Sequence, residues 1–227
     1  MVLELEGLIT TTKQLELSEE EKSYDEWQRW ALKEKRKLAT LPDLYNAGEK
    51  APDHILKQMQ DDFRKYTIIT GTTVMAITER SFKHLGGEIM HCDGIYGGGN
   101  YTQIPNLNTV PIKEALRVTT TEFVSKSFDA ALAGAGYTDN DGIFIWFMYN
   151  LLHHEQWAPP KKIIPPLERL TGLPAKKIRI QSNTKKSGVV ALRTLPNGDF
   201  LIDATYSFDK PGRTYVFTQE FHPYSGD

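Results

Sequence analysis

From Ile202 to Phe208 the sequence alternates apolar and polar residues, and with Phe200 and Leu201 this pattern constrains the fold more than any other in the sequence. Successive side chains of a strand point to opposite faces of a sheet. One face is therefore predicted to carry Phe200, Ile202, Ala204, Tyr206 and Phe208, and the other Leu201, Asp203, Thr205 and Ser207. Strand-like runs at 178–180, 190–194 and 214–221, separated by turn signals at 197–198 and 210–212, extend this to an antiparallel β-meander of three to four strands.

The first 160 residues are predicted to be mainly helical. Ser18 and Glu21 have the spacing of a capping box, which predicts a helix over 19–38. Pro52-Asp53 opens a second helix with apolar residues at every fourth position. Helical patterns also cover 72–85, 111–118, 120–133 and 143–152, the last apolar nearly all round and therefore buried. Short strands are expected at 66–70 and 88–92, and a Gly-rich loop at 93–108.

The predicted fold class is therefore α+β, with a mostly helical N-terminal part packed against the C-terminal meander. The proline-rich stretch 159–166 is the best candidate for a boundary or stiff linker, dividing the chain into 1–160 and 161–227, which still allows one continuous domain. The charge changes sign at the same place. Residues 1–160 carry a net charge of −7 and residues 161–227 carry +5.

This basic C-terminal part is the sequence feature that most favours a function. Between 161 and 193 there are nine Lys and Arg residues against one acidic residue, Glu168. Cations neutralise backbone phosphates, and exposed aromatic rings stack on bases. We therefore expect binding of a nucleic acid, another polyanion or a phosphorylated ligand through Lys176, Lys177, Arg179, Lys185, Lys186, Arg193, Arg213 and Tyr215.

An enzyme is the alternative hypothesis. His91 and Cys92 precede the Gly-rich loop, and His153 and His154 end the apolar helix. A thiolate with a neighbouring imidazole can act as a nucleophile and base in a hydrolase or transferase, with the loop as a lid. Neighbouring residues of a helix diverge by about 100°, so His153 and His154 are poorly placed to share zinc. No metal and no cofactor is predicted, and carboxylates such as Asp199 and Asp203 are expected to lie on solvated strand faces.

A third hypothesis is a structural or interaction protein of the viral or phage type, which allows a homo-oligomer. Trp27, Trp30 and Trp157 stand beside charged residues, and exposed aromatic side chains mark interfaces. The single cysteine excludes an internal disulfide. The acidic start predicts no signal peptide, and the longest apolar run is too short for a membrane span. We therefore expect a cytoplasmic location without membrane contact.

Overall fold

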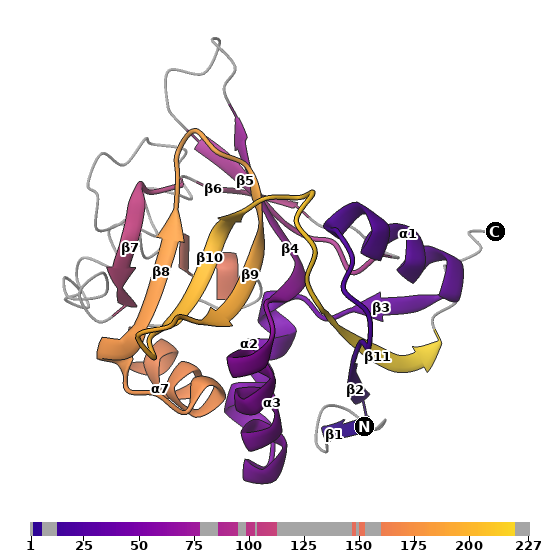
Figure 1. The fold of residues 1–227 in the computed structure, drawn as a ribbon. Coiled ribbons are helices and arrows are strands. Elements are labelled where there is room, and N and C mark those ends of the chain that lie inside the picture. Colours follow the sequence, from indigo (N-terminus) through magenta and orange to yellow (C-terminus); the bar gives the residue numbers. More distant parts are fainter. Residues whose placement is uncertain are drawn as a thin grey trace.

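Two β-sheets and a layer of helices form the described part of the chain (Figure 1). The structure, a computed structural model, describes residues 2–5, 13–77, 86–94, 99–102, 104–112, 147–148, 150–152 and 160–220. The helices are α1 (Tyr24–Glu34), α2 (Leu41–Lys50), α3 (Asp53–Lys65), α7 (Pro160–Thr171) and the short 3₁₀ helix η1 (Ala175–Lys177). The strands are β1 (Val2–Leu5), β2 (Lys13–Leu17), β3 (Arg36–Leu38), β4 (Ile68–Ile77), β5 (Gly86–His91), β6 (Gly99–Thr102), β7 (Leu107–Pro111), β8 (Ile178–Ser182), β9 (Gly188–Thr194), β10 (Phe200–Tyr206) and β11 (Tyr215–Glu220).

The larger sheet has seven strands in the order β6-β5-β4-β9-β10-β8-β7. The C-terminal strands β8, β9 and β10 exist as predicted, but the meander is wrong. β8 pairs with β10 in parallel, while β9 lies on the other side of β10 and pairs with β4. The connection from β8 to β9 therefore crosses over β10, which a meander does not do.

The smaller sheet has four strands in the order β1-β2-β11-β3. β11 leaves the neighbourhood of β10 and pairs with two strands from the beginning of the chain. Both sheets therefore combine strands from 1–160 and 161–227. The α+β class is confirmed, but the division into an N-terminal helical part and a C-terminal sheet is wrong.

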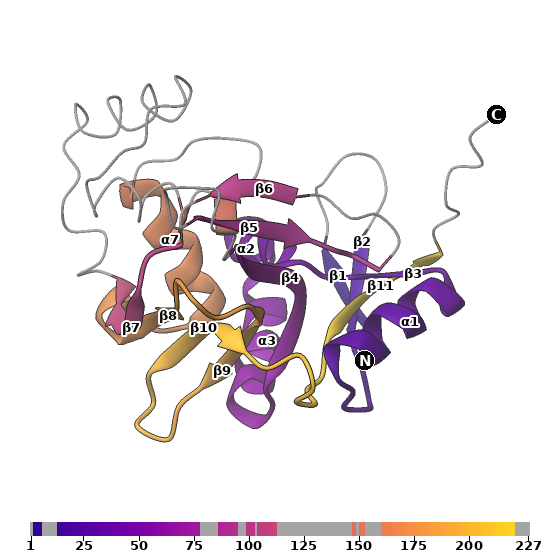
Figure 2. The ribbon, with the colours of Figure 1, turned by 90° about the horizontal axis from the view of Figure 1, so that it is seen from above.

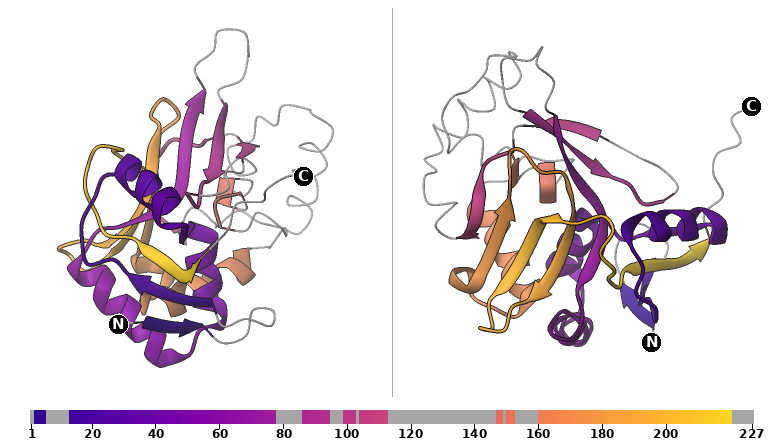
Figure 3. Two further views of the ribbon diagram at one scale, coloured as in Figure 1. Left: turned by 90° about the vertical axis from the view of Figure 1, so that its right-hand side faces the viewer. Right: turned by 45° about the horizontal axis from the view of Figure 1, so that its top comes forward.

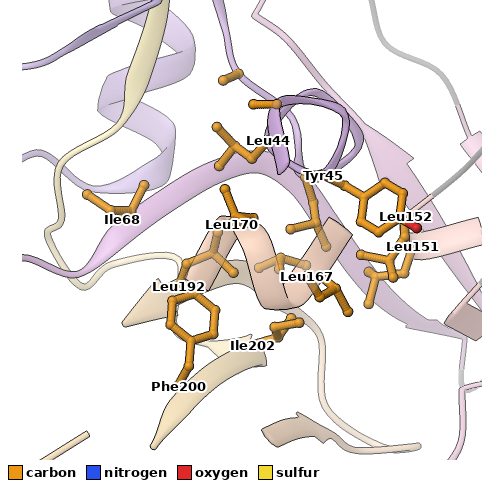
Figure 4. Packing of buried hydrophobic residues seen from close by; sticks show 14 of the residues in the cluster. Leu44, Tyr45, Ile68, Leu151, Leu152, Leu167, Leu170, Leu192, Phe200 and Ile202 are labelled. Carbon is orange, nitrogen blue, oxygen red and sulfur yellow. The ribbon is translucent and has the colours of Figure 1, made fainter. Parts of the chain in front are cut away.

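Helices α2, α3 and α7 cover one side of β8, β9 and β10 (Figure 2). Their apolar side chains meet those of the sheet in the main core, where Leu44 and Tyr45 of α2 and Leu167 and Leu170 of α7 lie near Leu192, Phe200 and Ile202 (Figure 4). The described residues of the apolar segment 143–152 are helical and buried, which agrees with the prediction for them. No described helix is long and apolar enough to cross a membrane.

Helix α1 begins five residues later than predicted. The capping box forms at Ser23 and Glu26, where the backbone N–H and the hydroxyl of Ser23 both donate to the Glu26 carboxylate at 2.8 and 2.7 Å. These donors hold the pKa of Glu26 below its ordinary value. The Ser18 hydroxyl donates to the Glu20 carbonyl instead. Lys35, with a φ of 52°, ends the helix, and β3 follows where a helix was expected.

The helix predicted over 72–85 is wrong in its described part, because β4 runs through Gly71 to Ile77. Thr72, Thr73 and Val74 are β-branched and favour a strand. Gly71 does not break the strand. It allows a close approach, since a Cβ there would lie 2.6 Å from the carbonyl oxygen of Cys92.

The proline-rich segment is helix α7 and not a linker, although Pro165 and Pro166 lie inside it. Burial of Ile163, Leu167 and Leu170 outweighs the missing backbone donors. α7 also packs closely on α2, because a Cβ at Gly48 would lie 2.3 Å from the Pro166 carbonyl oxygen. The sequence pattern misses α2 altogether, although Thr40 and Asp43 form its capping box.

The predicted Gly-rich loop also contains regular structure. Part of it forms β6, which pairs antiparallel with β5, and β7 begins at Leu107. Two helices are predicted over 111–118 and 120–133. Of these positions the structure describes only Pro111 and Ile112. His153, His154 and Trp157 also lie outside them.

The predicted alternation along β10 holds only as far as Ala204. Phe200, Ile202 and Ala204 face the main core, but the register of β10 against β9 shifts between Asp203 and Tyr206. Tyr206 therefore packs on the other face of the sheet, together with Phe208.

One buried hydrogen bond ties the smaller sheet to the helices. The hydroxyl of Tyr215 in β11 donates to the carboxylate of Asp62 in α3 at 2.7 Å, and both residues are buried. Burial and the Asp62 charge raise the pKa of Tyr215 far above its ordinary value. The ring of Tyr215 lies 6.5 Å from that of Phe63, which in turn lies 5.3 Å from Phe200 of the larger sheet.

We predict that Tyr215→Phe lowers the free energy of unfolding by about 1.5–3 kcal/mol, because a buried carboxylate loses a hydrogen bond while the packing volume is kept. Urea denaturation measures this. Tyr206→Phe is the control, since its hydroxyl donates to the uncharged carbonyl of Pro211, and the expected loss there is about 1 kcal/mol. Equal losses of stability in the two variants would show that the hydrogen bond from Tyr215 to Asp62 stabilises the fold no more than a bond to an uncharged carbonyl.

Candidate functional site: a polar network across the larger sheet

The candidate site is the face of β8, β10 and β9 opposite helices α2, α3 and α7. Arg179, Leu201 and Arg193 lie side by side across these three strands, because Leu201 is in register with Arg179 on one side and with Arg193 on the other. In the next row, Asp203 is in register with Gln181 and Ala191. We call the polar residues of this surface the network face: Thr109, Arg179, Gln181, Arg193, Asp199, Asp203 and Thr205.

Asp203 is the centre of one half of the network. One carboxylate oxygen accepts hydrogen bonds from the backbone N–H and the hydroxyl of Thr205 at 2.9 and 2.8 Å. The other oxygen accepts from Nη2 of Arg193 at 3.2 Å. The Asp203 side chain is only 7% exposed, whereas that of Arg193 is 36% exposed. A buried carboxylate therefore holds a guanidinium group that still reaches solvent.

Gln181 links this half to the second one. Its Nε2 donates to Thr205 Oγ1 at 3.2 Å, and its Oε1 accepts from the Thr109 hydroxyl at 3.3 Å. Arg179 then donates from Nη1 to the Thr109 carbonyl at 3.2 Å and from Nε to Asp199 Oδ2 at 2.5 Å. The network is continuous from β9 through β10 and β8 to β7, so the two arginines hold fixed positions relative to each other.

The guanidinium of Arg193 has a second contact on this face, with an aromatic ring. The group lies over the ring of Tyr206, with the Cζ atom 5.9 Å from the ring centroid, which is a cation–π contact. Its Nε is buried and has no hydrogen-bond partner among the residues that the structure describes. The Arg179 side chain is 29% exposed and that of Asp199 12% exposed. Both arginines therefore present a partly exposed, positively charged edge beside a carboxylate.

The predicted lysines lie at the two ends of β8. Lys176 and Lys177 belong to η1 just before the strand, and Lys185 and Lys186 belong to the turn after it. All four are exposed, and none forms an ion pair within the described part of the chain. They therefore do not form one patch but flank the network face at opposite ends.

Other basic residues of the C-terminal part have structural contacts. Arg169 donates to the carbonyls of Gly48, Glu49 and Ala51, which satisfies the C-terminal end of α2. Arg213 stacks on the ring of Tyr66 at 3.7 Å from the centroid, and it is half-buried. Arg213 therefore has a packing role in the fold, and its contact with a ligand stays a prediction.

The proposed stacking role of Tyr215 is wrong. Tyr215 is 0% exposed, and its ring lies in the main core while its hydroxyl contacts Asp62. An aromatic ring must be accessible to stack on a base. The expectation that Asp199 and Asp203 lie on solvated faces is also wrong, because both are buried.

His91 is held in one orientation by the protein itself. Its Nε2 lies 2.9 Å from the carbonyl oxygen of Asn150, which can only accept, so the hydrogen is on Nε2. Its Nδ1 lies 2.9 Å from the Thr72 hydroxyl, which itself accepts from the N–H of Leu41. Both ring nitrogens are thus occupied by structural contacts, which leaves no free nitrogen to serve as a base or metal ligand.

Cys92 directly follows β5 and is half-buried. Burial raises the pKa of its thiol, and the nearby charges of Asp93 and Glu88 add to this, while a hydrogen bond with Tyr24 acts in the opposite direction. A raised pKa lowers the thiolate fraction at neutral pH. The structure therefore does not favour the nucleophile hypothesis for Cys92, and its predicted partners His153 and His154 lie outside the described residues.

Within the described ranges no group of three or more His, Cys, Asp or Glu side chains is arranged to hold a metal ion. Sequence reasoning missed Thr109, Gln181 and Thr205 as members of the network face. The one available signal was the alternation that places Asp203 and Thr205 on the same side of a strand. The contacts of Thr109 depend on the position of β7, which no local pattern indicates.

Comparison with known proteins finds no match for this chain among family models, curated proteins or solved structures. The function of this protein must therefore be inferred from the geometry of the site.

We predict that Asp203→Asn lowers the free energy of unfolding by about 2–3 kcal/mol, because an amide cannot accept on both sides and would place an N–H group against Arg193 or Thr205. Denaturant titration measures the loss. Asp25→Asn is the matched control at an exposed position of α1, and it is expected to change stability by no more than about 0.5 kcal/mol. A neutral effect of Asp203→Asn would show that the network does not order this face.

For Cys92 we predict slow modification by a thiol reagent at pH 7, with a rate that still rises above pH 9 because the pKa of the thiol is raised. The reaction is followed by absorbance across a pH series, with Cys92→Ser as the blank. A modification rate at pH 7 equal to the rate at pH 9 would instead show that Cys92 is already a thiolate at neutral pH, which would support the enzyme hypothesis.

Proposed function

We propose that this protein binds a polyanion, such as a nucleic acid, along the network face. The observation that carries the proposal is the fixed pair of partly exposed guanidinium groups, Arg179 and Arg193, with exposed lysines beyond both ends of β8. Guanidinium groups bind phosphate with directional hydrogen bonds, and lysines add charge.

The spacing supports an extended ligand over a single phosphate group. Neighbouring strands lie about 4.8 Å apart, so Arg179 and Arg193, two strands apart, have backbones separated by roughly 10 Å. The five residues of β8 alone put roughly 13 Å between the two lysine pairs. One phosphate cannot reach all of these groups, whereas a chain of phosphates or sulfates can.

The two kinds of basic residue have different roles in this proposal. Asp199 and Asp203 compensate the charge of the two arginines, so the arginines contribute little net charge. The four exposed lysines supply the net positive charge and hence most of the salt-dependent affinity. The arginines fix the position of the ligand on the sheet.

We predict that the affinity for a fluorescently labelled oligothymidylate falls steeply between about 50 and 200 mM salt. Replacing Lys185 and Lys186 by Glu is expected to weaken binding and to reduce the slope of log K against log salt by roughly 1.4, since each contact to a single strand contributes about 0.7. Fluorescence anisotropy measures both quantities, and heparin tests a polyanion that carries no bases.

The control is the pair Lys57→Glu and Lys65→Glu, two exposed residues of α3, which changes the net charge by the same amount. Unchanged binding by this control variant supports the network face as the site. If heparin binds and oligothymidylate does not, the ligand is a polyanion other than a nucleic acid. Absence of binding to both probes at low salt, or equal weakening by the two double variants, would overturn the proposal.

A further inference from the structure

A second surface lies on the smaller sheet, away from the network face. α1 runs beside β11 and β3, as the indigo helix and the yellow strand in Figure 3 show. Between them is a groove of about 310 Å³. Its floor includes Glu16 and Val216, which are in register on β2 and β11, and its wall is formed by Trp27, Trp30 and Glu34 of α1. We call this the tryptophan groove.

One tryptophan ring of this groove already contacts a cation of the protein, and the second borders the open space. Trp27 and Trp30 meet edge to face, with centroids 5.5 Å apart and an angle of 86° between the planes. Trp27 is nearly buried, and its Nε1 donates to the Gly212 carbonyl at 2.8 Å, so its orientation is fixed. The ammonium of Lys22 lies 5.0 Å from the Trp27 centroid, which shows that this ring accepts a cation–π contact. Trp30 is half-buried and borders the same space.

The charges around the groove are mainly negative. Its carboxylates come from Glu16, Glu19, Glu20 and Glu34, and its cations from Lys22 and Arg36. Lys22 forms an ion pair with Glu20, and Lys33 lies 3.5 Å from Glu34. Glu16 is half-buried on the floor of the groove, and within the described part of the chain its carboxylate has neither a hydrogen bond nor an ion pair.

We propose that the tryptophan groove is a docking site for an arginine- or lysine-rich segment of a partner protein. The partner's cations would contact the Glu16 carboxylate and the exposed side of Trp30, and the alkyl parts of its side chains would pack on the rings. Arg36 lies at the β3 side of the groove, and its positive charge repels a basic residue of the partner there. The partner segment is therefore expected to carry a polar or acidic residue at that end. Charge complementarity thus defines the occupant, independently of the network face.

The test is calorimetric titration of the full chain with a short oligoarginine peptide, with an oligoglutamate peptide of the same length as the opposite-charge probe. We expect binding of oligoarginine only, with affinity reduced about tenfold by the double change Glu16→Gln and Glu34→Gln. Trp30→Ala is expected to weaken binding further, and Trp30→Phe to restore part of it. Near-ultraviolet circular dichroism checks that each variant keeps the fold.

The matched control changes Glu21 and Glu49 to Gln, two exposed acidic residues outside the groove lining, which alters the net charge equally. Unchanged affinity in this control, together with the loss in the groove variants, supports the proposal. No oligoarginine binding, equal loss in control and groove variants, or binding of oligoglutamate instead would overturn it. A salt-sensitive dimer that the groove variants abolish would assign the groove to a second copy of this chain and would also overturn it.

Discussion

The contact between Tyr215 and Asp62 joins the parts of this structure that the chain order separates. β11 comes from the end of the described chain, α3 from its first third, and the smaller sheet also contains strands from the N-terminus. A hydrogen bond from a hydroxyl to a buried carboxylate is costly to break. The ring of Phe63 in α3 also contacts one ring from each sheet, Tyr215 and Phe200. This junction fixes β11 and the segment just before it, in which Arg213 forms an isolated β-bridge with Ile68.

The basic residues of the C-terminal part have two different roles, which a count of charges does not distinguish. Three arginines are used inside the fold: Arg169 satisfies the end of α2, while Arg179 and Arg193 are ordered by Asp199 and Asp203. The described lysine side chains at the ends of β8 remain in solvent. Guanidinium groups suit such contacts because their donors form a rigid fork, whereas an ammonium group is strongly hydrated.

The sequence predicted those elements whose evidence is local. The strands β8 to β11 and helix α3 were found, because alternation, turn residues and four-residue spacing are encoded within a few positions. The pairing of β8 with β10, the passage of β4 through Gly71 and the helical state of the proline-rich segment depend on tertiary contacts. Of the residues on the network face, the sequence indicated Arg179 and Arg193 as candidates, and their ligand contacts stay a prediction. It missed Thr109, Gln181 and Thr205, and it included Tyr215, which is buried in the main core.

The central claim is that ligand binds on the network face and not elsewhere on the protein. Hydrogen–deuterium exchange in the presence and absence of oligothymidylate tests this most directly, because backbone protection locates the contact along the chain. The account predicts protection in the segments that span η1, β8 and the β8–β9 turn, and unchanged exchange in α3. Protection confined to α1 and α3, with none at 175–194, would contradict it.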